Sequence, residues 1–318
     1  MSFFQCRAPI NVQFEVTYRC NNFCVFCYNS VDNNEQDEVD TATAKNIIKN
    51  IHDSEVLSLN FNGGEPLVRD DIFELASYAK YLGLDIHLNT NANLIDDFLA
   101  RNISKNFLSI STTILSNNSE IHDKLSGRVG AFIDTLDGIE NLQRHSVYIA
   151  VNVVICKENI ININGIFDLL RHNHIRTLLL TKYIPCNNRD DLIISDDEFL
   201  RVIRDLYRYQ EKYRCFDRIA LPQPFRLCYS PKDIKDIIGK WNIPCNIGLC
   251  TATVSSNGFL TPCNLIKQPV IGNVTTDSIK KLWNGFDGQN FCISSFFSRH
   301  CTDCSLIGQC GGGCRATL

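Results

Sequence analysis

The stretch Tyr18–Tyr28, with the sequence YRCNNFCVFCY, carries three cysteines separated by three and then two residues. Cubane iron–sulfur clusters usually take four thiolate ligands. Cys20, Cys24 and Cys27 would therefore bind three irons of such a cluster and leave the fourth iron open to a small molecule. Two other interpretations stay open at this point, namely a zinc knuckle without a fourth ligand on this loop and three unrelated buried thiols.

The pattern resembles the signature of the radical S-adenosylmethionine (SAM) superfamily, Cys-x3-Cys-x2-Cys with an aromatic residue, here Phe26, before the last cysteine. This resemblance implies a [4Fe–4S] cluster whose open iron chelates the amino and carboxylate groups of SAM. It also implies that Phe26 helps to seat SAM. In this superfamily the reduced cluster cleaves SAM to methionine and a 5′-deoxyadenosyl radical.

A second motif, Gly63-Gly64-Glu65-Pro66, follows an alternating run at residues 56–62 that predicts a strand. Glycines directly after a strand allow positive φ and a close approach of the backbone to a ligand, although a plain turn is the alternative. The motif is similar to the Gly-Gly-Glu-Pro sequence of radical SAM enzymes. The similarity implies that the backbone and Glu65 contact the amino group of SAM, and that Ser111 or Thr113 on a later strand bonds the SAM ribose.

Alternating apolar runs and helical patterns predict six strand–helix units between residues 10 and 181. Parallel strands with right-handed crossovers curl into a partial barrel whose ligand site lies at the carboxyl ends of the strands. We therefore expect an α/β fold. Its parts would be a partial (β/α)6 radical SAM barrel over residues 1–195, a helical linker over residues 196–240, and a small cysteine-rich domain over residues 241–318.

Thiols return in the last quarter of the chain, as Cys245, Cys250, Gly258-x4-Cys263 and Cys301-x2-Cys304-x5-Cys310-x3-Cys314. This spacing resembles the SPASM domain, the auxiliary iron–sulfur domain of many radical SAM peptide maturases. The resemblance implies two auxiliary clusters. The first would be held by Cys245, Cys250, Cys263 and Cys314, and the second by Cys301, Cys304 and Cys310.

The second auxiliary cluster lacks an assigned fourth ligand. In the SPASM family this ligand is a cysteine downstream of the position of Cys314, whereas this sequence stops at Leu318. Three possibilities stay open: the ligand is missing, it is Cys292, or it lies beyond a truncated end. Zinc bound by the thiols between Cys301 and Cys314 is a further alternative.

The 318 residues carry a net charge of −4 without a stripe of Lys or Arg, so we expect no nucleic-acid partner. Apolar runs are too short to span a membrane, and the N-terminus lacks the apolar core of a signal peptide, so we expect no membrane association. Sixteen cysteines without a signal peptide indicate metal binding in a reducing compartment, which predicts a cytoplasmic protein.

These resemblances predict a radical SAM enzyme that modifies a peptide by hydrogen abstraction, with an oxidative thioether or C–C cross-link favoured. The stretch His122–Phe132 looks like one that is common among peptide-modifying members. Relatives that oxidise Ser or Cys carry a Ser-x-Asp near the end of strand four, where this chain has Leu115. The alternatives are a peptide epimerase, a radical SAM dehydrogenase of a small molecule, and a non-catalytic iron–sulfur or zinc scaffold.

Epimerisation needs a hydrogen donor, and Cys156 and Cys186 fall at or just past the ends of strands five and six. A small buried apolar side chain is the ordinary interpretation of each. The expected partners are a peptide substrate and an electron donor such as flavodoxin or ferredoxin. We also expect a separate leader-binding protein or leader binding on the barrel surface, because too few residues precede Ile10 for a leader-recognition domain.

Overall fold

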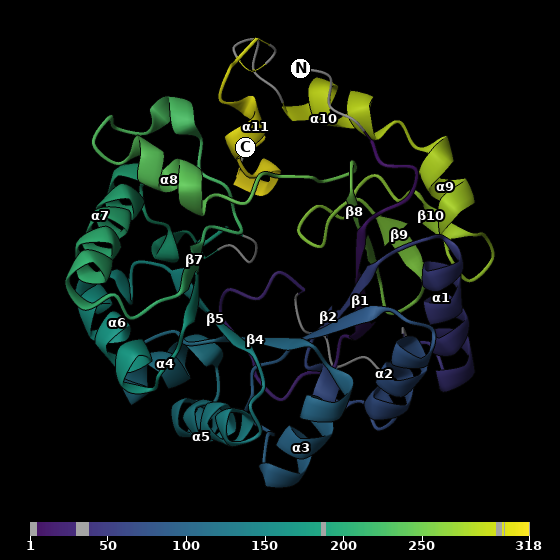
Figure 1. The fold of residues 1–318 in the computed structure, drawn as a ribbon, viewed down its shortest axis with the longest axis horizontal. Helices are drawn as coiled ribbons and strands as arrows, with labels where there is room; N and C mark the ends of the chain where they lie inside the picture. The colour runs from purple at the N-terminus through teal and green to yellow at the C-terminus, as the bar shows by residue number, and fades with distance from the viewer. Residues whose placement is uncertain (1–4, 30–37, 186–188, 297–300, 302, 318) are drawn as a thin grey trace.

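The computed structural model describes residues 5–29, 38–185, 189–296, 301 and 303–317. The described residues form one curved sheet with the strand order β10-β9-β8-β1-β2-β3-β4-β5-β6-β7, and helices cover its outer side (Figure 1). The strands are β1 (Asn11–Thr17), β2 (Ser58–Gly63), β3 (Asp85–Asn89), β4 (Ser109–Thr113), β5 (Ile149–Ile155), β6 (Thr177–Lys182), β7 (Arg218–Ala220), β8 (Thr251–Val254), β9 (Phe259–Thr261) and β10 (Gly272–Asn273). The helices are α1 (Thr41–Asp53), α2 (Ile72–Tyr81), α3 (Asp97–Asn106), α4 (Ser119–Ser126), α5 (Ala131–Arg144), α6 (Ile163–His172), α7 (Asp196–Tyr213), α8 (Lys235–Trp241), α9 (Ile279–Gly285), α10 (Gly288–Phe296) and α11 (Ile307–Cys310).

The first six strands confirm the predicted partial barrel. β1 to β6 pair in parallel in chain order, and at least one helix links each strand to the next. This arrangement brings the carboxyl ends of all six strands to one rim of the barrel, where parallel α/β folds bind their ligands. The rim therefore collects the motif residues that follow β1, β2 and β4.

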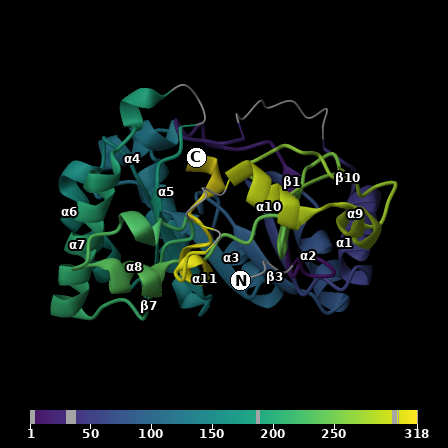
Figure 2. The same ribbon diagram turned by 90° about the horizontal axis from the view of Figure 1, so that it is seen from above.

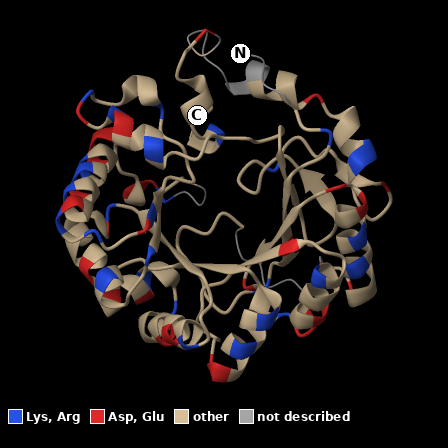
Figure 3. Cartoon of the chain, viewed as in Figure 1, with Lys and Arg blue, Asp and Glu red and all other residues tan. Residues whose placement is uncertain are grey.

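Helix α1 shows how a covering helix packs through one apolar face. In α1 the buried residues are Ala44, Ile47, Ile48 and Ile51, at the spacing of a single helical stripe. Asp40 caps this helix by accepting the backbone N–H of Thr43 at 2.7 Å. Lys, Arg, Asp and Glu lie mainly on the outer helices and loops, and the inner strands are nearly free of charge (Figure 3).

The sheet extends past the predicted six strands at both edges. β7 pairs in parallel with β6, so the stretch expected to be a helical linker also supplies a strand. At the other edge β8, which comes from the cysteine-rich end of the chain, pairs in parallel with β1, from Asn11 with Thr251 to Phe14 with Val254. The proposed division near residue 241 therefore falls between two parts that share one sheet.

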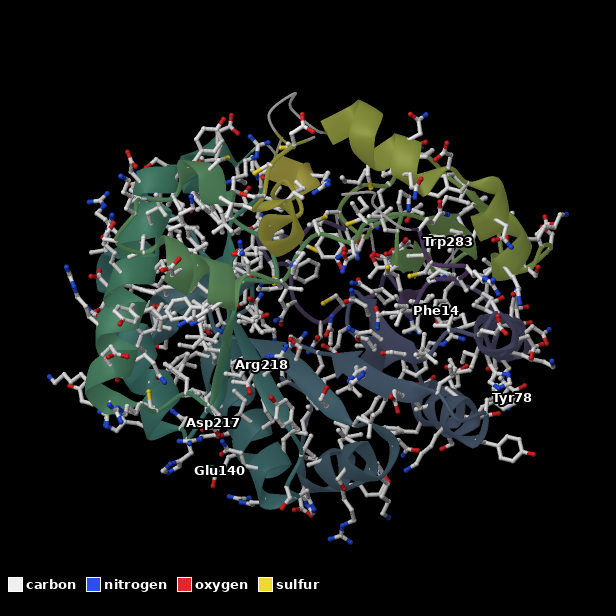
Figure 4. All side chains as sticks on the ribbon, turned by 45° about the horizontal axis from the view of Figure 1, so that its top comes forward. Phe14, Tyr78, Glu140, Asp217, Arg218 and Trp283 are labelled. Carbon is white, nitrogen blue, oxygen red and sulfur yellow. The ribbon has the colours of Figure 1, made fainter. Side chains whose placement is uncertain are left out.

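The C-terminal helices complete the ring of elements between β10 and α8 (Figure 1). Seen from above, α11 lies between α8 and α10 (Figure 2). Trp283 on α9 is fully buried, and its indole N–H donates to the carbonyl of Cys6 at 2.8 Å (Figure 4). No helix within the described ranges is long and apolar enough to cross a bilayer.

Candidate active site

A cavity of about 380 Å³ opens at the carboxyl ends of the barrel strands. It brings together residues from the cysteine loop, from the ends of β2 to β6, from α4, and from the segment after β9. Its lining is Gln13, Cys20, Asn22, Cys24, Phe26, Cys27, Tyr28, Asn62, Gly63, Gly64, Asn89, Thr90, Asn91, Ser111, Thr113, Leu115, His122, Ser126, Thr135, Asn152, Val154, Thr181, Lys182, Tyr183, Ile184, Asn264 and Leu265. The predicted cofactor residues Phe26, Gly63, Gly64, Ser111 and Thr113 are all part of this wall.

The cysteine loop is fixed against the end of α4. Two backbone N–H groups of the loop, those of Phe23 and Val25, each donate at 3.0 Å to the carbonyls of Ser126 and Leu125. These bonds place Cys24 between two anchored residues. Part of the stretch that resembles peptide-modifying enzymes therefore has a structural task, which is to hold the cysteine loop at the rim of the cavity.

Cys20, Cys24 and Cys27 all face the cavity. Burial raises the pKa of the Cys20 thiol to about 11, although the backbone N–H of Asn22 donates to its sulfur at 3.4 Å. Burial also raises the pKa of Cys24, and the neighbouring cysteine thiolates add to this effect. Thiols bind metals as thiolates, so cluster binding would release these protons. Three thiols around one open cavity fit a cluster that keeps one iron free for a ligand.

The Gly63-Gly64 pair packs directly against the segment that leads into the cysteine loop. The N–H groups of Gly64 and Glu65 donate to the carbonyls of Thr17 and Arg19 at 2.8 and 2.9 Å. Gly63 has a φ of +125°, and a Cβ built on it would lie well under 3.0 Å from the carbonyl oxygen of Thr17. Glycine is therefore required here, because only glycine combines this backbone conformation with such a close approach.

Glu65 is buried beneath the cavity wall and is absent from its lining. Its carboxylate accepts hydrogen bonds from Leu67 N at 3.0 Å, Thr90 Oγ1 at 2.8 Å and Asn91 N at 2.7 Å. Burial raises the pKa of this carboxyl to about 7, and the hydrogen bonds oppose the rise. In this structure Glu65 fastens the motif to the end of β3, and Pro66 begins the short 3₁₀ helix Pro66–Val68 behind it.

His122 lies in the cavity wall, a position that the sequence did not indicate. Its side chain is buried and packs edge-on against Phe132, with ring centroids 5.5 Å apart. Neither ring nitrogen has a hydrogen-bond partner among the described residues. Burial lowers the pKa of the imidazole to about 4, so His122 is neutral near pH 7.

Of the two predicted hydrogen donors, the structure describes Cys156. Cys156 is buried in a small apolar cluster with Leu115, Leu125, Tyr183 and Leu192, one layer behind the cavity wall. Among the described lining residues, the only thiols are the three of the cysteine loop. Cys186 lies outside the described residues.

Comparison with known families identifies two domains in the chain. The family model of the radical SAM superfamily matches residues 14–170, and that of the iron–sulfur cluster-binding SPASM domain matches residues 245–311. The chain belongs to the radical SAM superfamily. A radical SAM domain implies a [4Fe–4S] cluster with SAM, and a SPASM domain implies auxiliary iron–sulfur clusters.

Curated relatives include both tetrapyrrole and peptide enzymes. Fe-coproporphyrin III synthase of Methanosarcina barkeri is 34% identical over 62% of this chain, and the match spans about half (49%) of that relative. AdoMet-dependent heme synthase of the same organism is 27% identical over 97% of this chain and 92% of its own length. Mycofactocin maturase MftC of Mycolicibacterium smegmatis is 24% identical over 97% of this chain and 79% of its own length.

Solved structures show the same fold at low sequence identity. anSMEcpe with bound AdoMet has a TM-score of 0.76 and 17% identity, and the match covers 97% of this chain and 90% of that one. SuiB of Streptococcus suis bound to its precursor peptide SuiA also has a TM-score of 0.76 and 17% identity, with 98% and 73% covered. At this identity the likeness establishes the radical SAM fold and no more.

The first auxiliary array gathers near the N-terminal segment. Cys245, Cys250 and Cys263 pack around the buried residues Ile247 and Leu249. Burial raises the pKa of Cys314 to about 12, and the nearby thiolates of Cys245 and Cys263 add to the rise, which places Cys314 with the same group. The sulfur of Cys250 also lies 2.9 Å from that of Cys6, a contact that the sequence did not predict.

The second auxiliary array lines a separate cavity of about 320 Å³. Cys301, Cys304 and Cys310 share this cavity with Cys228, a residue outside the SPASM motif. Burial raises the pKa of Cys228, and its neighbours Cys310 and Cys301 add to the rise. Among the described residues no three His, Cys, Asp or Glu side chains form a group that could hold a single metal ion.

Proposed function

We propose that this chain is a radical SAM enzyme that cross-links a peptide substrate by net oxidation, through a thioether or a C–C bond. The observation that carries the proposal is the chemistry of the cavity wall beside the cysteine loop. Apart from the cysteines, the polar side chains of the wall are mostly neutral amides and hydroxyls, among them Asn62, Asn89, Asn91, Asn152 and Asn264 with Ser111, Thr113, Thr135 and Thr181. Such groups match the alternating N–H and C=O groups of a peptide backbone.

Fixed charge is scarce in the same wall. Lys182 is the one Lys or Arg among the described lining residues, and its ammonium pairs with Asp196 at 2.6 Å. The imidazole of His122 is neutral near pH 7 because its pKa is about 4. A substrate with several carboxylates, such as a coproporphyrin, would call for a cluster of cations, since guanidinium and ammonium groups are the usual partners of carboxylates.

When bound, the cluster and SAM supply a 5′-deoxyadenosyl radical that can abstract a hydrogen from an unactivated carbon. The chain holds the reacting groups together, because the cysteine loop is anchored to α4 and the Gly63-Gly64 turn is bonded to the segment before Cys20. The barrel wall surrounds the reaction site and limits the entry of water, which would otherwise allow side reactions.

Two observations favour cross-linking over epimerisation. The chain has ten motif cysteines, which is more than the SAM cluster requires, and additional clusters suit a reaction that removes electrons from its substrate. Epimerisation needs a hydrogen donor at the substrate, and of the two predicted donors Cys156 lies behind the cavity wall, whereas Cys186 lies outside the described residues. A radical SAM dehydrogenase of a small molecule differs from both peptide enzymes by its substrate, and the substrate experiment described below distinguishes it from them.

Tetrapyrrole conversion is the second candidate function. It is favoured by the AdoMet-dependent heme synthase, which aligns with 97% of this chain over 92% of its own length. Its weakness is the near absence of cations in the described cavity wall. We therefore rank it below peptide modification.

The first experiment tests whether the chain is an enzyme or a scaffold. Anaerobically reconstituted protein with dithionite and SAM is expected to release 5′-deoxyadenosine, and Cys24→Ala is expected to release none. Cys215→Ala is the matched control, because Cys215 is a buried thiol in the stretch between α7 and β7, away from every motif. Equal product from Cys24→Ala and wild type would contradict the proposal.

The second experiment identifies the substrate. The enzyme, SAM and reductant are incubated in D2O with the precursor peptide encoded next to its gene and, separately, with Fe-coproporphyrin III. Loss of two hydrogens from the peptide supports oxidative cross-linking. Gain of deuterium at unchanged connectivity would establish epimerisation, and turnover of the porphyrin or of a small molecule alone would overturn the peptide assignment.

The proposal also covers the electron donor, the delivery of the peptide and the compartment of the reaction. We infer a separate electron donor such as flavodoxin or ferredoxin, and a leader-binding protein that brings the peptide to the cavity. Among the described residues no two cysteines form a disulfide, which fits a reducing compartment such as the cytoplasm. Pull-down of the tagged chain with each candidate partner, followed by a turnover assay, tests these assignments.

A further inference from the structure

Four thiols from two distant parts of the chain line the cavity of about 320 Å³ behind α11. Cys301, Cys304 and Cys310 come from the SPASM motif, and Cys228 comes from the short 3₁₀ helix Leu227–Tyr229 before α8. The wall is completed by Arg226, Tyr229, Leu306, Ile307 and Gly312. Four cysteines around one space are the usual ligand set of a [4Fe–4S] cluster.

The position of Cys228 is fixed by its neighbours on both sides of the cavity. Arg226 donates from Nε to the carbonyl of Gly312 at 3.2 Å, and the N–H of Cys314 donates to the carbonyl of Pro224 at 3.1 Å. Leu227 is buried in the same core cluster as Cys310. The segment that carries Cys228 is therefore tied to the segment that carries the motif cysteines.

Cys292, the candidate that the sequence suggested, belongs to a different place. Its side chain is fully buried with Ile247 and Leu249, next to the thiols of the first auxiliary array. Its thiol donates to the carbonyl of Ile247 at 2.9 Å. Cys292 is also absent from the described wall of the second cavity.

We propose that Cys228 is the fourth thiolate ligand of the second auxiliary [4Fe–4S] cluster, together with Cys301, Cys304 and Cys310. On ligation each thiol loses its proton and forms one sulfur–iron bond, with no change in the oxidation state of the sulfur. The proposal rests on the four thiols that line this one cavity, and it holds for either candidate substrate. Its tests do not use turnover, so they are separate from the tests of the proposed function.

The first test is differential alkylation of the wild-type protein, read by mass spectrometry. In the cluster-free chain Cys228 is exposed and should react quickly with iodoacetamide. After anaerobic reconstitution Cys228 should become protected together with Cys301, Cys304 and Cys310, and chelation of iron should restore its reactivity. Buried Cys215 is the internal control and should react slowly in both states. Fast alkylation of Cys228 in loaded protein whose other three thiols are protected would overturn the proposal.

The second test uses a background in which Cys20, Cys24 and Cys27 are replaced by Ala, so that only auxiliary clusters remain. Adding Cys228→Ala should leave one iron of the second cluster without a thiolate, and its EPR signal should then shift on addition of imidazole. Cys228→Ser should keep the iron and sulfide but change the spectrum, because an oxygen replaces a sulfur. Cys292→Ala and Cys215→Ala should leave the signal of the second cluster unchanged.

Two results of this second test would refute the assignment. One is a Cys228→Ala protein with the iron content, sulfide content and imidazole-insensitive spectrum of its parent. The other is zinc without sulfide in the second site of the purified chain. If Cys228→Ala does not fold, as judged by circular dichroism, then Cys228→Ser and the alkylation pattern of wild type decide the question.

Discussion

Gly63→Ala provides a direct test of how the Gly-Gly turn positions the cysteine loop. Gly63 has a φ of +125°, and an added Cβ would lie well under 3.0 Å from the carbonyl oxygen of Thr17. That oxygen belongs to the backbone and also accepts the N–H of Gly64 at 2.8 Å, so it cannot rotate away like a flexible side chain. Gly83 is the matched control, because it has a φ of +89° and nothing within 4 Å of its added Cβ.

The expected magnitudes follow from these two environments. At Gly83 the Ala variant is destabilised only by its left-handed backbone, by roughly 1–2 kcal/mol. Alanine also makes the unfolded chain stiffer, which offsets about 0.4–1 kcal/mol of this loss. At Gly63 the same cost applies, and overpacking against Thr17 adds about 1–3 kcal/mol. We therefore expect a loss of about 1 kcal/mol for Gly83→Ala and about 2–4 kcal/mol for Gly63→Ala.

Urea unfolding of the cluster-free proteins measures the stability difference, and iron content with 5′-deoxyadenosine release measures its effect on the site. Gly63→Ala should also lose iron and SAM cleavage, because the displaced Thr17 carbonyl shifts the segment that ends in Cys20. Gly83→Ala should keep both. Equal unfolding midpoints for the two variants, or full SAM cleavage by Gly63→Ala, would refute the reasoning.

Two further predictions concern buried ionisable groups. The pKa of His122 is about 4 in the folded chain and 6.5 for an unperturbed histidine, so the unfolded chain binds the extra proton between these pH values and stability falls as pH is lowered. This loss of unfolding free energy approaches about 3 kcal/mol and should be absent in His122→Gln. Parallel pH profiles of the urea midpoints for wild type and His122→Gln would contradict the prediction. The ammonium of Lys267 donates to both carboxylate oxygens of fully buried Glu15 at 3.0 Å. Lys267→Met should therefore destabilise the chain by about 2–3 kcal/mol. This loss is at or below the low end for a buried ion pair, because the Lys267 side chain is 43% exposed. Adding Glu15→Gln should recover part of this loss, and strict additivity in the double-mutant cycle would argue against the pairing.

The sequence predicted those parts of the fold whose patterns are long and local. β1 to β6 have five to seven residues each and alternate with amphipathic helices, so their period is visible without any structure. β7 has three residues, which is too short for a recognisable alternation, whereas β8 is recognisable in the sequence only as one arm of a hairpin with β9 around the Asn257-Gly258 turn. Their places beside β6 and β1 depend on long-range pairing, which no local pattern records.

The candidate site shows the same division between local and long-range information. Cys20, Cys24 and Cys27 stand on one loop, so their spacing alone indicated a shared ligand. The resemblance of the Gly-Gly-Glu-Pro motif predicted that Glu65 contacts the amino group of SAM, whereas the structure turns its carboxylate toward Thr90 and Asn91. The sequence did not indicate a role for Cys228, because the cysteines that share its cavity come from the C-terminal end of the chain.

The cysteine-rich end is an integral part of the barrel site. Asn264 and Leu265, directly after Cys263, form part of the cavity wall, and Lys267 neutralises the buried Glu15 of β1. β8 covers the edge of β1, which would otherwise expose unpaired backbone groups beside the cysteine loop. Removal of this end would therefore open the cavity, leave a buried carboxylate without its cation and free the strand that leads to Cys20. It follows that the two parts of the chain must fold together to form one site.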